Sequence, residues 1–174
     1  MRGSVKGRTV IFSQRDFRDA LGMFPSGVCV ISGRASDDRP IGITASSFTS
    51  VSLDPPLISF NVSKSLRSFA DILGMETFVV SVLTESQSVV SSGFAQAGSD
   101  KWACTEFKSG RTSNPVIVPN IAVFECHRYG IHEAGDHMLI LGRVVHFEID
   151  ESAQPLVYFR GKYRRMGELI EFAA

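Results

Sequence analysis

Apolar residues recur at helical spacing near the start of the chain. They occupy positions i, i+3, i+4 and i+7, at Phe17, Ala20, Leu21 and Phe24. This period predicts an amphipathic helix. Ser13 and Asp16 stand at the spacing of a helix cap, with the acid in the first turn, where the helix dipole favours negative charge. We expect the sequence Pro25-Ser26-Gly27 to end this helix.

Short apolar runs bounded by turn residues predict that most of the remaining chain forms β-strands. The runs span 28–31, 57–62, 77–83, 121–131 and 138–149. The last two are long enough to form the arms of one hairpin. Two further helices are expected, one starting within 63–68 with Gly74 just past its end, and one over about 86–96. This pattern indicates a mostly β domain with peripheral helices, built as a barrel or a sandwich.

One stretch, residues 42–56, differs from an ordinary buried strand. It begins apolar, passes through small and hydroxylated residues, and stops at Asp54-Pro55-Pro56. A buried strand would carry bulky branched residues at its inward positions. The short side chains instead leave main-chain N–H and C=O groups open to a flat ligand. A surface strand with a serine-rich edge explains the spacing equally well.

Composition limits the class of protein. With 174 residues, 44% of them hydrophobic, the chain can form one domain with a packed core. We place this domain at 13–166, between tails at 1–12 and 167–174. Lys+Arg 18 balances Asp+Glu 18, so the charge gives no reason to expect nucleic acid or a membrane surface as a partner. No apolar run approaches the roughly 20 residues of a membrane span.

Cysteine usage and missing motifs narrow the chemistry further. The three cysteines are widely spaced and form no C-x-x-C pair, which favours a reducing, cytoplasmic compartment. His127 and His132 would point to opposite faces of one strand, and we expect no metal site. No G-x-S-x-G, Walker A or G-x-G-x-x-G motif occurs. A nicotinamide dinucleotide would therefore be bound without a Rossmann fold.

Four stretches together resemble a known family. They are 24–28 (Phe-Pro-Ser-Gly-Val), 42–56, 135–137 (Gly-Asp-His) and 155–161 (Pro-Leu-Val-Tyr-Phe-Arg-Gly). The small flavin reductases of two-component monooxygenases carry similar stretches in the same order, and the resemblance covers roughly 13–166. It implies a flavin-reductase-like split β-barrel, a homodimer, and hydride transfer from NADH or NADPH to FAD or FMN. It also implies a separate monooxygenase that receives the reduced flavin.

The resemblance assigns flavin contacts to three segments. The isoalloxazine contacts are Thr44, Ala45, Ser46 and Ser47, with Ser50 and Ser52 as weaker candidates. The phosphate contacts, at an expected strand-to-helix junction, are Asn61, Val62, Ser63, Lys64 and Ser65. Hydroxyls, a cation and the N–H groups of a helix N-terminus favour an anion there, although an ordinary helix cap explains the same residues. Contacts to the flavin's tail are Phe94 and Ala95, which helix packing explains nearly as well.

The resemblance also assigns contacts to the nicotinamide dinucleotide. His137 follows Asp136 in a glycine-containing turn, and a neighbouring carboxylate can raise the pKa of a histidine or fix its orientation. The pyrophosphate and adenine end would be recognised by Tyr158, Phe159, Arg160 and Gly161. Arg160 is the first candidate, because its planar fork suits phosphate. From the residues alone, a solvent-exposed turn histidine and a charged edge strand remain open alternatives.

Two other functions fit the same residues. A split-barrel flavin carrier or redox sensor would use 44–47 to bind flavin, while 135–137 and 158–161 would serve the fold. A barrel interface module would bind no flavin. We assign no catalytic side chain, because the redox chemistry belongs to the flavin. Cys29 departs from the small hydroxylated or apolar residue of similar reductases, and a buried inert thiol is one interpretation.

Overall fold

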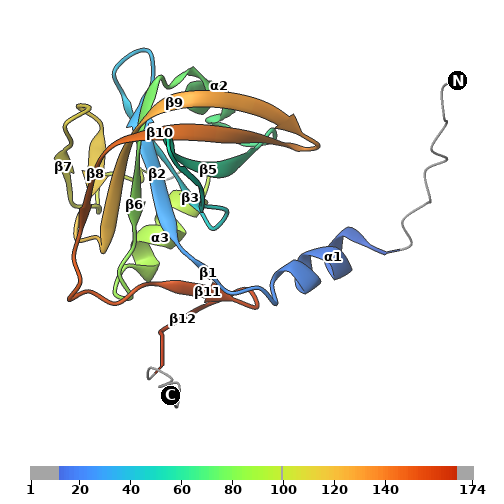
Figure 1. Cartoon of the computed structure of the whole chain (residues 1–174). Helices are drawn as coiled ribbons and strands as arrows, with labels where there is room; N and C mark the ends of the chain where they lie inside the picture. Colours follow the sequence, from blue (N-terminus) through green and yellow to red (C-terminus); the bar gives the residue numbers. More distant parts are fainter. Residues whose placement is uncertain (1–11, 99, 168–174) are drawn as a thin grey trace, which may run out of the picture.

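The computed structural model describes residues 12–98 and 100–167, and its main element is one large antiparallel sheet (Figure 1). Its seven strands follow the order β3-β2-β6-β9-β10-β5-β4. They are β2 (Cys29–Arg34), β3 (Pro40–Ala45), β4 (Thr49–Leu53), β5 (Pro56–Ser63), β6 (Thr77–Val82), β9 (Ala122–Ala134) and β10 (His137–Ile149). The predicted mostly β class is confirmed, including the long hairpin of β9 and β10.

The connection between β3 and β4 shows that this sheet is a barrel. These strands lie at opposite ends of the strand order, so a flat sheet would hold them roughly 29 Å apart at a spacing of about 4.8 Å per strand. Only residues 46–48 join them, and that length of chain reaches about 14 Å. The sheet therefore curls until its two edges are close, and it stays open between them. Of the two architectures that the sequence left open, the structure is therefore the barrel and not the sandwich.

The same connection corrects the prediction for the central stretch. Residues 42–56 form not one element but the end of β3, a crossover at 46–48, and β4, which pairs with β5. The Ser47 hydroxyl accepts a hydrogen bond from the Asn61 N–H at 2.9 Å, which links the crossover to β5. Small hydroxylated residues serve here to bridge two edges of the barrel.

Buried residues form more than one cluster, and the largest contains residues of β2, β3, β5 and β6. Phe60 and Phe78 are fully buried and meet edge to face, with ring centroids 5.2 Å apart. Each such ring contributes about 1.5–3 kcal/mol by leaving water. A second buried cluster beneath α3 (Ser88–Ala95) contains Val30, Leu83 and Phe94. It fixes this helix, whose place within 86–96 agrees with the prediction.

The first helix begins as predicted and ends earlier. In α1 (Gln14–Leu21), Ser13 Oγ accepts from the Asp16 N–H and the Asp16 carboxylate accepts from the Ser13 N–H, so the capping box is confirmed. The helix ends at Leu21 with Gly22 as its cap, before Pro25 is reached. It extends away from the sheet (Figure 1), and every residue from Phe12 to Leu21 is exposed.

The helix expected to start within 63–68 starts later, as α2 (Phe69–Gly74). Strand β5 continues to Ser63 because its partner β10 pairs with it as far as His137. The Lys64 N–H then donates to the Asp136 carbonyl at 2.9 Å, and a turn leads into the helix. Gly74 is the last helical residue, followed by Met75 as the cap.

Three short strands were not predicted, namely β1 (Ser26–Gly27), β7 (Phe107–Ser109) and β8 (Pro115–Ile117). Strand β1 forms a small sheet below the barrel with β11 (Val157–Phe159) and β12 (Lys162–Arg164), where a charged edge strand was one alternative, and β7 pairs with β8 (Figure 1). Such short strands give too few alternations to read. The predicted tails at 1–12 and 167–174 lie almost wholly outside the described residues. Within the described part, no helix is long and apolar enough to cross a membrane.

Candidate functional site

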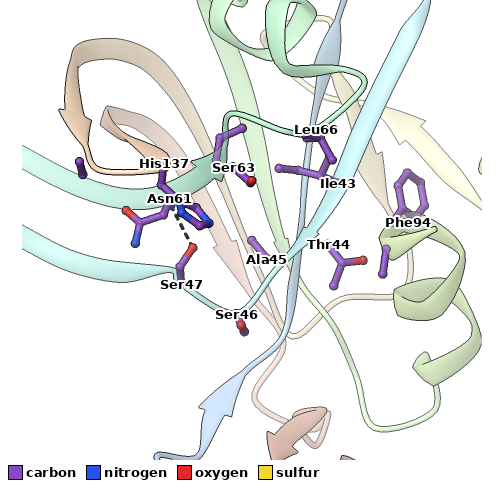
Figure 2. A pocket seen from close by; sticks show the side chains of 13 residues that line it. Ile43, Thr44, Ala45, Ser46, Ser47, Asn61, Ser63, Leu66, Phe94 and His137 are labelled. Carbon is purple, nitrogen blue, oxygen red and sulfur yellow. Dashed lines mark hydrogen bonds between the residues drawn. The ribbon is translucent and has the colours of Figure 1, made fainter. Parts of the chain in front are cut away.

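A cavity of about 460 Å³ lies at the opening of the barrel (Figure 2). This volume is within the range of about 300–1,000 Å³ that is typical of small-molecule sites. Strand β3, the crossover, strand β5, α3 and the tip of the β9–β10 hairpin each contribute to the walls. The lining residues are Ile43, Thr44, Ala45, Ser46, Ser47, Asn61, Val62, Ser63, Leu66, Phe94, Ala95, Ala134 and His137.

The β3 wall presents backbone to the cavity. Among the described strands, β3 pairs with β2 only, so its other edge offers the N–H and C=O groups of alternate residues to a ligand. Ala45 and Ser46 are too short to cover these groups. Behind the wall, the buried Cys29 thiol donates to the Ala45 carbonyl at 3.3 Å. Burial raises the pKa of this thiol to about 12, which supports the interpretation of an inert group.

Helix α3 forms the apolar wall and is tied to β3 by side chains. Thr44 Oγ1 donates to the Ser91 carbonyl at 2.6 Å. The Lys101 ammonium donates to the Phe94 carbonyl at 2.9 Å and to the Gly42 carbonyl at 3.2 Å, so one cation bridges the helix end and the strand. Burial lowers the pKa of Lys101. These bonds hold the Phe94 ring against the cavity.

The hairpin tip closes the polar side of the cavity. His137 lies near Asn61 and Ser47 in Figure 2. Its Nδ1 lies 2.7 Å from an Asp136 carboxylate oxygen, so a ligand would meet Nε2. This hydrogen bond and the charge of His137 lower the pKa of Asp136. The carboxylate therefore stays ionised and orients the imidazole ring.

The predicted phosphate segment is placed differently from expectation. Ser63 ends β5 and a turn follows before α2 begins at Phe69, so residues 63–65 lie at no helix N-terminus. Ser63 and Ser65 hydroxyls lie 2.9 Å apart, and the Ser65 N–H donates to Ser63 Oγ. Lys64 forms an ion pair with Glu133 on the hairpin, which lowers the pKa of that carboxyl. Hydroxyls and a cation are present, but Lys64 and Ser65 lie outside the cavity walls.

The structure brings together most of the predicted flavin contacts. One cavity unites Thr44, Ala45, Ser46, Ser47, Asn61, Val62, Ser63, Phe94 and Ala95 with His137. Ser50 and Ser52 lie on β4, outside its walls. Three lining residues, Ile43, Leu66 and Ala134, were not named from the sequence. Ile43 and Leu66 had the pattern of core residues, and Ala134 carries no chemical signal of its own.

The four remaining predicted residues lie elsewhere. Tyr158, Arg160 and Gly161 line a separate cavity with Gly22 and Met23, and Phe159 neighbours them on β11. Arg160 and Gly161 form the turn between β11 and β12 with φ of 51° and 72°. The Arg160 N–H donates to the Gly22 carbonyl at 2.9 Å, which ties this turn to the end of α1. Their assignment to the dinucleotide stays a prediction.

The fold and the cavity define a class of protein: a split barrel with a small-molecule site at its opening, built from a backbone edge, hydroxyls and one oriented histidine. Comparison with known proteins gives the family. Residues 21–167 match the family described as "Flavin reductase like domain". The chain belongs to this flavin reductase family, and α1 lies almost entirely before the matched region.

Individual relatives agree with this assignment. A "Probable flavin reductase" of Rhizobium meliloti is 42% identical over 88% of this chain, and this chain spans only about half (49%) of that relative's length. The reductase component of 4-hydroxyphenylacetate 3-monooxygenase from Thermus thermophilus is 36% identical, with 86% of this chain and 95% of that protein covered. An NADH:FAD oxidoreductase of Streptomyces globisporus, solved with NAD and FAD fragments, superposes with a TM-score of 0.84 at 33% identity over 88% of this chain and 93% of that one.

Proposed function

We propose that this protein is an NAD(P)H:flavin oxidoreductase that supplies reduced flavin to a separate monooxygenase. The observation that carries this proposal is the cavity at 43–47, where a free strand edge and short side chains meet an oriented histidine inside a flavin reductase domain. The flavin, FAD or FMN, supplies the redox chemistry by accepting a hydride from NADH or NADPH. The protein binds and orients both molecules.

The lining residues fit a flavin by their chemistry. The apolar surfaces of Ile43, Leu66 and Phe94 suit the ring faces. Backbone N–H groups of β3 and the crossover suit the part of the ring that gains negative charge on reduction. The hydroxyl groups of Ser46 and Ser63 add donors at the cavity's polar end.

The direct test is oxidation of NADH and NADPH, each crossed with FMN, FAD and riboflavin and followed by the absorbance of the reduced nicotinamide. We expect turnover that depends on added flavin. Turnover without added flavin would identify a tightly held prosthetic group. An absence of turnover in every combination, with flavin retained through gel filtration, would replace this proposal with the flavin carrier or redox sensor.

His137 is assigned to the nicotinamide dinucleotide, and a histidine pair on the same hairpin tests it. His137→Ala should raise the KM for NADH or NADPH about tenfold, the effect of one lost hydrogen bond, with flavin affinity largely kept. His132→Ala is the matched control, because His132 is exposed on β9 and outside the cavity walls. An unchanged nicotinamide KM in His137→Ala would contradict the assignment.

We also propose a homodimer. Large apolar side chains are exposed on α1 and just after it, including Phe17 at 50% and Phe24 at 79%, and on β10, including Phe147 at 60% and Ile149 at 61%. Phe147 and Ile149 are two residues apart on β10 and so share one face of the strand, and grouped apolar surface of this kind marks protein interfaces. Light scattering after gel filtration should give twice the chain mass of 19.0 kDa. A single chain mass at micromolar concentration would rule the dimer out.

A further inference from the structure

A second groove lies next to the candidate flavin cavity along β3. It has a volume of about 390 Å³, and residues 40–42 of β3 line it, while 43–45 line the cavity. In the turn before α2, Leu66 lines the cavity and Ser68 lines the groove. Strand β3 and the turn before α2 therefore each line both hollows, with residues that are one or two positions apart. A single extended ligand could occupy both.

The groove carries the side chains that a nucleotide needs. Arg39 and Lys101 place two cations on its walls, and Trp102 adds an aromatic side chain. Guanidinium and ammonium groups bind phosphate, and a purine base stacks on an indole ring. The indole is held in place, because it meets the Phe94 ring edge to face at 4.9 Å and the Phe107 ring at 5.0 Å.

Asp100 lines the groove and Asp37 and Asp71 lie beside Arg39, but each of these carboxylates already has a donor or a cation as its partner. The Asp100 carboxylate accepts from the N–H groups of Trp102 and Ala103, both at 3.2 Å. Asp71 accepts from Arg39 at 3.1 Å, and Asp37 also faces that guanidinium at 3.6 Å. A guanidinium has five N–H donors and an ammonium three. Arg39 therefore has N–H donors beyond those that face Asp71 and Asp37. Lys101 likewise has a donor beyond those that bond the Phe94 and Gly42 carbonyls.

We propose that this groove binds the adenosine monophosphate half of FAD, which makes FAD the preferred flavin over FMN. The inference rests on the proposed flavin reductase function and names its flavin. In this arrangement the ring occupies the cavity at 43–47, the second phosphate meets Arg39 or Lys101, and adenine lies on Trp102. FMN lacks the adenylate and would leave the groove empty.

Direct binding tests the proposal without turnover. The dissociation constants of FAD and FMN are measured by flavin fluorescence on the purified protein, with no nicotinamide present. FAD should bind at least about tenfold more tightly than FMN, as one stacked base and one phosphate contact would supply. Arg39→Gln and Ser68→Trp, which remove a cation and fill the groove, should each bring the ratio of the two constants toward one.

Arg34→Gln is the matched control for the charge change. Arg34 lies on the same β2–β3 hairpin, forms an ion pair with Asp38 at 3.5 Å, and lines a different cavity. The Arg34→Gln substitution should leave the ratio of the FAD and FMN dissociation constants unchanged. Equal affinity for FAD and FMN in the unmodified protein would overturn the groove's role while the reductase function stands. A change in the KM for NADH or NADPH in Arg39→Gln, at a constant flavin ratio, would assign the groove to the dinucleotide instead. Failure to bind any flavin would refute the proposed function itself.

Discussion

Gly42 is the position at which one added methyl group should reach the flavin site. It lies in β3, where a Cβ would come within 2.6 Å of Phe94 Cε1 and 2.9 Å of Phe94 Cδ1. It would also come within 3.3 Å of Trp102 Cζ2. Ordinary contacts of a Cβ begin at 3.4 Å, so the Phe94 ring must move by about 0.8 Å. The ring is only 1% exposed and is packed against Trp102, so it has little room to move.

The expected cost of Gly42→Ala follows from this overlap. Overpacking of a close-packed interior destabilises by about 1–3 kcal/mol. For a chain of this size, each kcal/mol lowers the Tm by about 2–4 °C, which predicts a fall of roughly 2–12 °C. Because the Phe94 ring also lines the cavity, its displacement should raise the flavin Kd several-fold. Thermal unfolding and flavin fluorescence measure the two effects.

Gly93→Ala is the control, one residue before the same ring. A Cβ at Gly93 meets nothing within 4 Å, and alanine favours a helix over glycine by about 1 kcal/mol, so stability should stay level or rise. Phe94→Leu should relieve the overlap, so the double variant Gly42→Ala with Phe94→Leu should lose less than the sum of the single losses. A Gly42→Ala protein with unchanged Tm and flavin Kd would refute the contact reasoning.

Two further outcomes test buried groups away from the cavity. Burial alone would raise the pKa of Glu125, but donors from Thr112 and a neighbouring backbone N–H hold it below its ordinary value. The ionised Glu125 carboxylate therefore stabilises the folded state at neutral pH, and this stabilisation is lost as pH falls through the lowered pKa. Glu125→Gln should therefore lower the free energy of unfolding in urea by about 1.5–3 kcal/mol at neutral pH. The difference between the two proteins should shrink as pH falls through the lowered pKa, and a difference that stays constant with pH would contradict this. Ellman's reagent should modify only the exposed thiol of Cys104 in the native protein and all three thiols after denaturation. The reason is that Cys29 and Cys126 are buried, and burial raises the pKa of each thiol to about 12. Rapid modification of all three thiols in the native protein would refute this.

The strands were the most predictable part of the fold, because their signal is local. The apolar runs at 57–62 and 77–83 match β5 and β6 closely. The start of α2 was mispredicted, because Ser63 and Lys64 are held by the neighbouring hairpin through pairing with His137 and a bond to the Asp136 carbonyl. A tertiary contact of this kind overrides a capping signal, and a single sequence does not reveal it.

The candidate site was predictable where residue type carries the chemistry. Short side chains at 44–47 indicated an exposed backbone, and these residues do line the cavity. The groove beyond it was missed because its residues have ordinary interpretations one at a time. Arg39 belongs to a charged turn and Trp102 to a polar loop, and only folding brings them to the same side of β3.

The position of the cavity follows from the way the barrel closes. A seven-stranded sheet whose edges are joined by residues 46–48 must curl, and in this barrel the two edge strands β3 and β4 do not pair with each other. In that crossover Ser46 and Ser47 line the cavity and leave it hollow, whereas Phe48 packs against the core. The Ser47 hydroxyl accepts from the Asn61 N–H and holds the crossover to β5. In other sheets an unpaired strand edge can pair with another chain and cause aggregation, but the unpaired edge of β3 faces the cavity, where a ligand can bind it. Thus the same small residues that permit closure of the barrel also create its binding site.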